Sequence, residues 1–152
     1  MSQDYNSTLN LTKTDFPMRG NLPKREPDTL TKWEDIKLYD KMMAKNDGKP
    51  SYILHDGPPY ANGSIHLGTA LNKVLKDFII KQKNMSGFKA PYVPGWDTHG
   101  LPIELKAMKS IGVENGAIPP VELRKHCHDF ALKHVESQMA QFKRLGSIGK
   151  YD

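Results

Sequence analysis

Residues 51–97, SYILHDGPPYANGSIHLGTALNKVLKDFIIKQKNMSGFKAPYVPGWD, contain the alternation that decides the predicted fold. The run 51–57 is short and mostly apolar and ends at a glycine-proline turn, which is typical of a buried strand. Apolar residues then recur every three or four positions over 67–83, which predicts a helix, and 89–97 resembles a second short strand. Strand, helix and strand at this length indicate a βαβ unit with parallel strands and a right-handed crossover.

The flanking sequence predicts one extended segment and three further helices. Residues 1–27 are polar and interrupted by prolines, so we expect an extended arm. An amphipathic pattern over 28–46 ends at Asn46-Asp47-Gly48 and predicts a helix within 28–48. Helices are also expected over 102–112 and 119–145.

The predicted fold class is α/β. A doubly wound sheet needs about five or six strands, and this sequence supplies two convincing ones. We therefore expect the first half of a Rossmann-like, parallel-sheet nucleotide-binding fold, truncated at residue 152.

Amino-acid composition indicates a globular protein but does not identify its binding partner. The 152 residues are 38% hydrophobic and 26% charged, which suits one globular domain. The net charge of +5 is a mild surplus that favours a polyanionic partner but is also common in ordinary enzymes. Cys127 is the single cysteine, so no internal disulfide forms and a reducing compartment is expected. Without an apolar run of about 18 residues or a targeting segment, the sequence predicts a cytoplasmic protein with no membrane partner.

The first of two polar clusters, HDGPPYANGSIHLG at 55–68, comes directly after the first predicted strand. In an open parallel sheet, ligands bind beyond the carboxyl ends of the strands. A helix that begins near His66 presents unpaired N–H groups, which bind phosphate readily, and Gly68 lets a ligand approach the backbone closely. The alternative interpretation is that His66 only caps the helix.

The second cluster, GWDTHGLP at 95–102, follows the second predicted strand. A carboxylate at Asp97 could bind a ligand ammonium, act as a base or hold a metal. Alternatively, Asp97 forms an Asx turn or caps the next helix. The histidines and carboxylates do not have metal-ligand spacing, so we predict no metal site in this segment.

These two clusters, with LNKVLKDF between them, resemble the amino-terminal catalytic segment of class I aminoacyl-tRNA synthetases. The flanking stretches TDFPMRGNLPKREP and FKRLGSIG are similar to the same family, so the resemblance covers essentially the whole chain. GWDTHG is similar to the isoleucine branch, whereas the valine and leucine branches carry GTDHAG and GWDAFG. The resemblance implies a ligase that activates isoleucine with ATP to isoleucyl-adenylate and transfers it to tRNA(Ile), with residues 49–152 as the first part of its catalytic domain.

The resemblance also assigns roles to residues. The family's His-x-Gly-His element matches His66 and Gly68, with Thr69 at its fourth position, and these three are the implied catalytic residues. The implied ATP-binding residues are Pro59, Asn62, Gly63, His66, Gly68, Thr69 and Asn72. The implied isoleucine-binding residues are Gly57, Pro58 and Asp97. Mg²⁺ is expected to accompany ATP.

Other parts of such enzymes are expected outside residues 1–152. These are the Lys-Met-Ser-Lys-Ser loop, the editing domain, the anticodon-binding domain and the zinc-binding tail. The chain is therefore predicted to be an amino-terminal piece, inactive alone and prone to self-association, of an enzyme expected to be monomeric. Two alternatives stay open: a stand-alone nucleotide-binding module, and an RNA-binding fragment that uses Arg19, Lys24 and Arg25.

Overall fold

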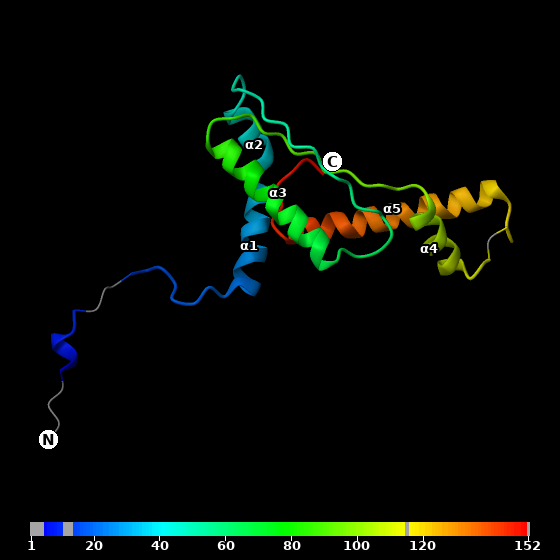
Figure 1. Ribbon diagram of the computed structural model, residues 1–152. Helices are drawn as coiled ribbons and strands as arrows, with labels where there is room; N and C mark the ends of the chain where they lie inside the picture. The colour runs from blue at the N-terminus through cyan, green and yellow to red at the C-terminus, as the bar shows by residue number, and fades with distance from the viewer. Residues whose placement is uncertain (1–4, 11–13, 115, 152) are drawn as a thin grey trace.

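The computed structural model describes residues 5–10, 14–114 and 116–151. A short 3₁₀ helix, η1, and five α-helices follow one another along the chain (Figure 1). Their bounds are η1 Asn6–Thr8, α1 Leu22–Asp35, α2 Leu38–Lys45, α3 Leu67–Met85, α4 Leu101–Ile111 and α5 Pro120–Arg144. Over these ranges, no helix combines the length and apolar character needed to cross a membrane.

The predicted Rossmann-like parallel sheet is wrong for this chain. No strand or sheet occurs in the residues that the structure describes; two isolated parallel bridges, Ser51 to Lys89 and Tyr60 to Asp97, join the extended segments 51–60 and 89–97. Prolines at 58, 59, 91 and 94 remove backbone donors from these segments, and a ladder needs a donor at every second residue. The segments therefore run side by side without a continuous hydrogen-bond ladder.

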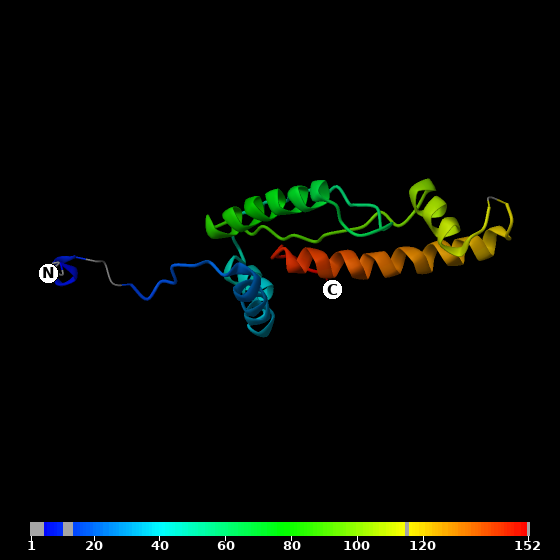
Figure 2. The ribbon, with the colours of Figure 1, turned by 90° about the horizontal axis from the view of Figure 1, so that it is seen from below.

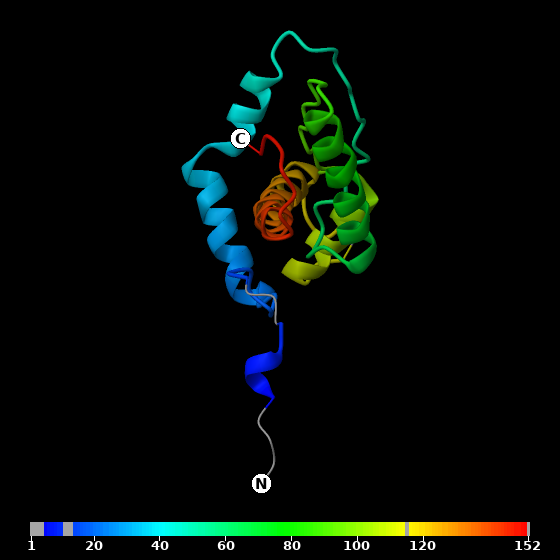
Figure 3. The same cartoon turned by 90° about the vertical axis from the view of Figure 1, so that its left-hand side faces the viewer.

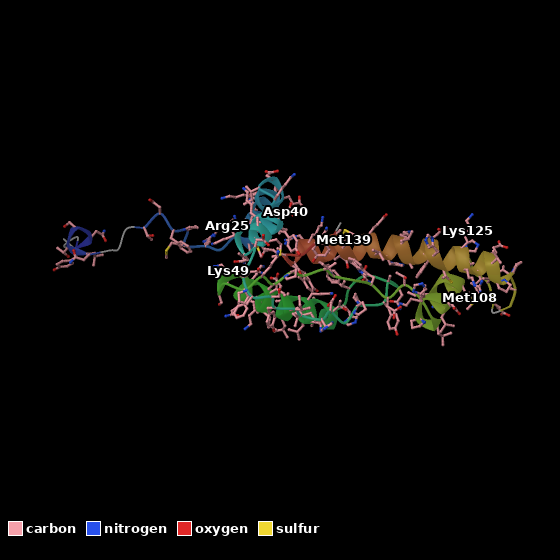
Figure 4. All side chains as sticks on the ribbon, turned by 90° about the horizontal axis from the view of Figure 1, so that it is seen from above. Arg25, Asp40, Lys49, Met108, Lys125 and Met139 are labelled. Atoms are coloured by element: carbon pink, nitrogen blue, oxygen red, sulfur yellow. The ribbon has the colours of Figure 1, made fainter. Side chains whose placement is uncertain are left out.

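The helices lie in layers around these two extended segments. Figure 2 shows α3 on one side of the segments and α5 on the other. Helix α4 packs on the amino-terminal half of α5, and α1 and α2 cross near its opposite end. Viewed end-on, α5 lies between α1 and α3 (Figure 3). The side chains of Met108 and Lys125 mark the α4 end of this arrangement, and Arg25 and Lys49 mark the other (Figure 4).

Two small apolar clusters form the core. One contains Ala61, Ile103 and Ala131 and lies between the extended segments, α4 and α5. The other contains Ile80, Ala90 and Tyr92 and lies between α3 and the segments. The stacked rings of Trp96 and Phe142, 6.2 Å apart, also hold α5 against the second segment.

The predicted helices over 67–83, 102–112 and 119–145 are confirmed within two residues by α3, α4 and α5. The amino-terminal prediction was less accurate. Helix α1 already begins at Leu22, inside the stretch expected to be extended, because Pro23 lies in its first turn, where the lost N–H is harmless. The single helix expected over 28–46 breaks at Lys37, whose φ of 51° is left-handed.

Helix α3 buries its polar side and exposes its apolar side. The buried residues are Lys73, Asp77, Ile80 and Asn84. The exposed apolar residues between 67 and 79, spaced three or four positions apart or adjacent, are Leu67, Leu71, Leu75, Phe78 and Ile79, and we call them the α3 stripe; Met85 at the end of the helix is exposed too. The buried polar groups are all bonded: the Asn84 amide, for example, donates to the carbonyls of Ile80 and Ala90, each at 2.9 Å.

Candidate nucleotide and amino-acid site

His66 caps the amino terminus of α3. Its backbone is extended, with φ −105° and ψ 172°, and its ring Nδ1 accepts a hydrogen bond of 3.2 Å from the backbone N–H of Thr69. Because Nδ1 accepts, the proton of the neutral ring lies on Nε2, which is the donor available to a ligand. The capping geometry weighed from the sequence is therefore present, and it leaves a second ring nitrogen for chemistry.

Gly68 makes room for this ring. A Cβ at residue 68 would lie 3.0 Å from Cε1 and 3.1 Å from Nδ1 of His66, closer than ordinary carbon contacts. The imidazole therefore folds over the first turn of α3 in space that a side chain at residue 68 would crowd. His66 and Gly68 are both exposed, and Thr69 is half-buried beside them.

Asp97 lies beside the Pro58-Pro59 turn on the neighbouring segment. Its backbone N–H donates to the carbonyl of Pro59 at 2.9 Å, and its carbonyl accepts from the N–H of Ala61 at 2.9 Å. Its carboxylate Oδ1 accepts from the N–H of His99 at 3.1 Å, which is an Asx turn. Gly57 and Pro58 are exposed next to this point, so the structure brings the predicted amino-acid residues to one edge of the molecule.

The loop between the turn and α3 contains the predicted residues Asn62 and Gly63. The Asn62 carbonyl accepts from Lys106 Nζ at 2.8 Å, and its side-chain amide donates to the Pro102 carbonyl at 3.4 Å. These bonds tie the loop to α4. Asn72 is exposed in the second turn of α3.

A buried ionic cluster connects the two halves of the site. The carboxylate of Asp56, one residue before Gly57, is bonded to the ammonium groups of Lys73 and Lys76 on α3, the latter at 2.6 Å. Lys73 is 1% exposed and also donates to the Tyr92 hydroxyl at 3.0 Å. Burial alone would raise the pKa of Asp56, but the two lysines outweigh it and hold this pKa below its usual value. The cluster fixes α3 against the segment that carries the turn.

Two cavities are present in the described part of the chain, and neither is formed by the predicted site residues. One, of about 310 Å³, lies between α1, α3 and the carboxyl end of α5, and Arg25 of the predicted basic arm lines it. The other, of about 720 Å³, lies between α4 and α5 and begins at Thr98, directly after Asp97. None of the ten predicted binding residues lines either cavity. Over the described part of the chain, no three histidine, cysteine or acidic side chains come together as a metal site would require.

Residues 28–152 match the family described as tRNA synthetases class I (I, L, M and V). The chain belongs to this class I synthetase family. The resemblance drawn from the two polar clusters is thereby confirmed, and those clusters lie within the matched residues.

The chain is similar to proteins named isoleucine–tRNA ligase. It is 62% identical over 149 residues to the ligase of Thermoanaerobacter sp. (strain X514) and 60% identical over 149 residues to that of Caldanaerobacter subterraneus subsp. tengcongensis. It is 58% identical over 148 residues to the ligase of Desulforudis audaxviator. The matches cover 97–98% of this chain but 16% of the length of each relative.

Sequence reasoning missed the residues that hold this class I segment in place. Lys106, Gln138 and Gln141 reach the loop 60–65 from α4 and α5, and none lies in a recognised motif. The sequence signal for Gln138 is its position: the apolar period of α5 assigns residue 138 to the buried side, although glutamine is polar. In the structure, the side chain of Gln138 is 3% exposed.

Proposed function

We propose that this chain supplies the ATP-phosphate and isoleucine half-sites of an isoleucine–tRNA ligase. In this proposal, His66, Gly68 and Thr69 meet the ATP phosphates at the start of α3, and Pro59, Asn62, Gly63 and Asn72 complete the ATP site. Gly57, Pro58 and Asp97 bind isoleucine. The reaction is attack of the isoleucine carboxylate on the α-phosphate, which gives isoleucyl-adenylate and releases pyrophosphate, followed by transfer to tRNA(Ile).

The observation that carries the proposal is that a helix amino terminus and a carboxylate lie at the two ends of the loop 60–65: α3 begins after His66, and Asp97 forms a bridge with Tyr60. Free N–H groups and the positive end of the α3 dipole favour a phosphate beside His66. Asp97 lies on the adjacent parallel segment, where a carboxylate can pair with an ammonium. A triphosphate and an amino acid bound at these two places would approach each other from opposite ends of the loop 60–65.

Several parts of the proposal rest on the family rather than on this site. Mg²⁺ would arrive with the ATP phosphates, and no protein ligand set is assigned to it. Contact with tRNA and action in the cytoplasm follow from the proposed ligase. Residues 49–152 are proposed as the first part of the catalytic domain, preceded by the amino-terminal segment that contains α1 and α2.

The test is titration of the chain with Mg–ATP, comparing wild type with His66→Asn. Asparagine is a good helix cap, so the melting temperature should change little. Its amide N–H donors lie closer to the backbone than Nε2–H of the imidazole and do not reach the same place, so we expect ATP affinity to fall about tenfold or more, as for loss of a hydrogen bond to a charged group. His126→Asn on α5 serves as the control.

Two results would contradict the proposal. Wild-type chain without saturable ATP binding would remove the nucleotide site. Equal ATP affinity of wild type and His66→Asn would leave His66 with a capping role alone.

A further inference from the structure

We infer that Gln138 and Gln141 of α5 are positioning residues that hold the loop 60–65, and with it His66, in place for ATP. The choice of ATP as the ligand rests on the proposed function. The contacts that hold the loop are observed independently of that function.

The two glutamines bond to three backbone groups of the loop. Gln138 donates through Nε2 to the carbonyl of Tyr60 at 3.0 Å and to the carbonyl of Gly63 at 2.7 Å, which uses both of its amide protons. Gln141, one turn later on the same helix, accepts through Oε1 from the N–H of Ile65 at 2.8 Å. Gln138 is 3% exposed, so these bonds are made away from water.

The loop needs partners from outside because it lies between an extended segment and a helix. Half-buried backbone groups in such a loop lose water without gaining a ladder or helix partner, and an unpaired group is costly. Ile65 directly precedes the capping His66, so its bond to Gln141 sets where the α3 amino terminus begins. Lys106 fixes the opposite side of the loop through the Asn62 carbonyl.

The two glutamines use opposite chemistry toward the loop. Gln138 contacts it only as a donor, whereas Gln141 contacts it only as an acceptor. A glutamate keeps acceptor oxygens and loses the donor. Gln141→Glu therefore retains its bond to Ile65, while Gln138→Glu loses two bonds and places a carboxylate against two carbonyl oxygens.

The experiment compares Gln138→Glu, Gln141→Glu and Gln141→Leu in the whole 152-residue chain, with Gln82→Glu on the exposed side of α3 as the control. Mg–ATP affinity and exchange of the Ile65 amide proton are measured for each. We expect Gln138→Glu and Gln141→Leu to weaken ATP binding about tenfold or more, and Gln141→Glu and Gln82→Glu to leave it near wild type.

Amide exchange tests the positioning independently of ATP. Exchange at Ile65 should accelerate about tenfold or more in Gln141→Leu and stay near the wild-type rate in Gln141→Glu. If wild type does not bind ATP, the proposed function fails, and this exchange pattern still decides the positioning role. Equal Ile65 exchange in Gln141→Leu, Gln141→Glu and wild type would overturn the inference. So would wild-type ATP affinity in Gln138→Glu.

Discussion

His66 and Gly68 work as one unit at the start of α3, because the ring of the first occupies the space that a side chain at the second would fill. This pair stands out in the sequence, because a helix start that only needs a cap usually carries serine, threonine, aspartate or asparagine rather than histidine and glycine. The sequence left open whether His66 caps the helix or serves a ligand. The structure shows the cap, which uses Nδ1, and the proposed ligand contact would use the other ring nitrogen, Nε2.

The stability effect of Gly68→Ala should depend on His66. In the wild-type chain, the gain in helix propensity of about 1 kcal/mol is opposed by loss of the cap, which is also worth about 1 kcal/mol. In a His66→Ala background the conflict is absent, so Gly68→Ala should raise the free energy of unfolding by about 1 kcal/mol. Urea unfolding of the four chains measures this. The same change in both backgrounds would show that the ring and residue 68 do not compete.

The Asp97 carboxylate has one observed role, in the Asx turn, and one proposed role, as a negative charge for the ligand ammonium. The substitution Asp97→Asn separates the two roles. The asparagine oxygen still accepts from His99, so the Asx turn should persist and the melting temperature should change little. If Asp97 pairs with the isoleucine ammonium, removing its charge should cost about 3–5 kcal/mol of binding.

Pyrophosphate exchange would measure this effect in a chimera in which the chain replaces the matching segment of the Thermoanaerobacter ligase. Asp129→Asn, an exposed carboxylate on α5, is the control. An unchanged KM for isoleucine would remove Asp97 from the amino-acid site.

Among the elements, α3 shows best what periodicity can and cannot predict. Its range follows from three- and four-residue spacing, yet its buried side carries Lys73, Asp77 and Asn84 rather than the α3 stripe. A pattern does not reveal that Asp56 and Lys73 pair across 17 positions. Apolar runs predict strands in the extended segments, but the prolines of these segments prevent a continuous ladder.

The ionic cluster beneath α3 predicts a loss of stability in acid. The pKa of Asp56 is lower in the folded chain, so its contribution is complete above the unfolded value near 3.9 and is lost as the pH falls through the folded value. Asp56→Asn should cost about 3–5 kcal/mol at neutral pH, because Lys73 is left buried without its counter-charge.

Thermal unfolding would be measured from about pH 2 to about pH 7, a range that spans the titration of carboxylates, for Asp56→Asn and for wild type. The variant should also lose less stability than wild type on acidification. Asp47→Asn, which breaks an exposed pair with Lys89, is the matched control and should have little effect. Equal behaviour of the two variants would mean that the buried cluster does not stabilise the fold.

For the whole molecule, the outward direction of the α3 stripe is the dominant feature. Its members are 40–86% exposed, and α4 adds Leu101 and Leu105, at 63% and 54%. Apolar surface of this kind usually marks an interface or a tendency to associate. The family and the two polar clusters could be identified from sequence, but the direction of this stripe could not, since it depends on how α3 packs.

We expect the isolated chain to self-associate through the α3 stripe and to show no isoleucine-dependent pyrophosphate exchange. Substituting Leu71→Lys and Leu75→Lys together should shift the chain toward monomer in sedimentation velocity, because two charges would enter the contact. Val121→Lys, at an exposed apolar position on α5, is the control. A monodisperse wild-type monomer at high concentration would contradict the first expectation, and measurable exchange would contradict the second.

The attachment of the loop 60–65 to α5 also sets an order of events during synthesis. The glutamines that hold the loop are 75–78 positions later in the chain than the groups they bind. At about 5–20 residues per second, several seconds pass on the ribosome between the appearance of the loop and that of its anchors. The turns of α3 depend on local bonds and can form early, whereas the bonds between the loop and α5 have to wait. A nascent chain halted before α5 would therefore carry α3 with its local His66 cap, while the loop 60–65 is held only from the α4 side, through Lys106.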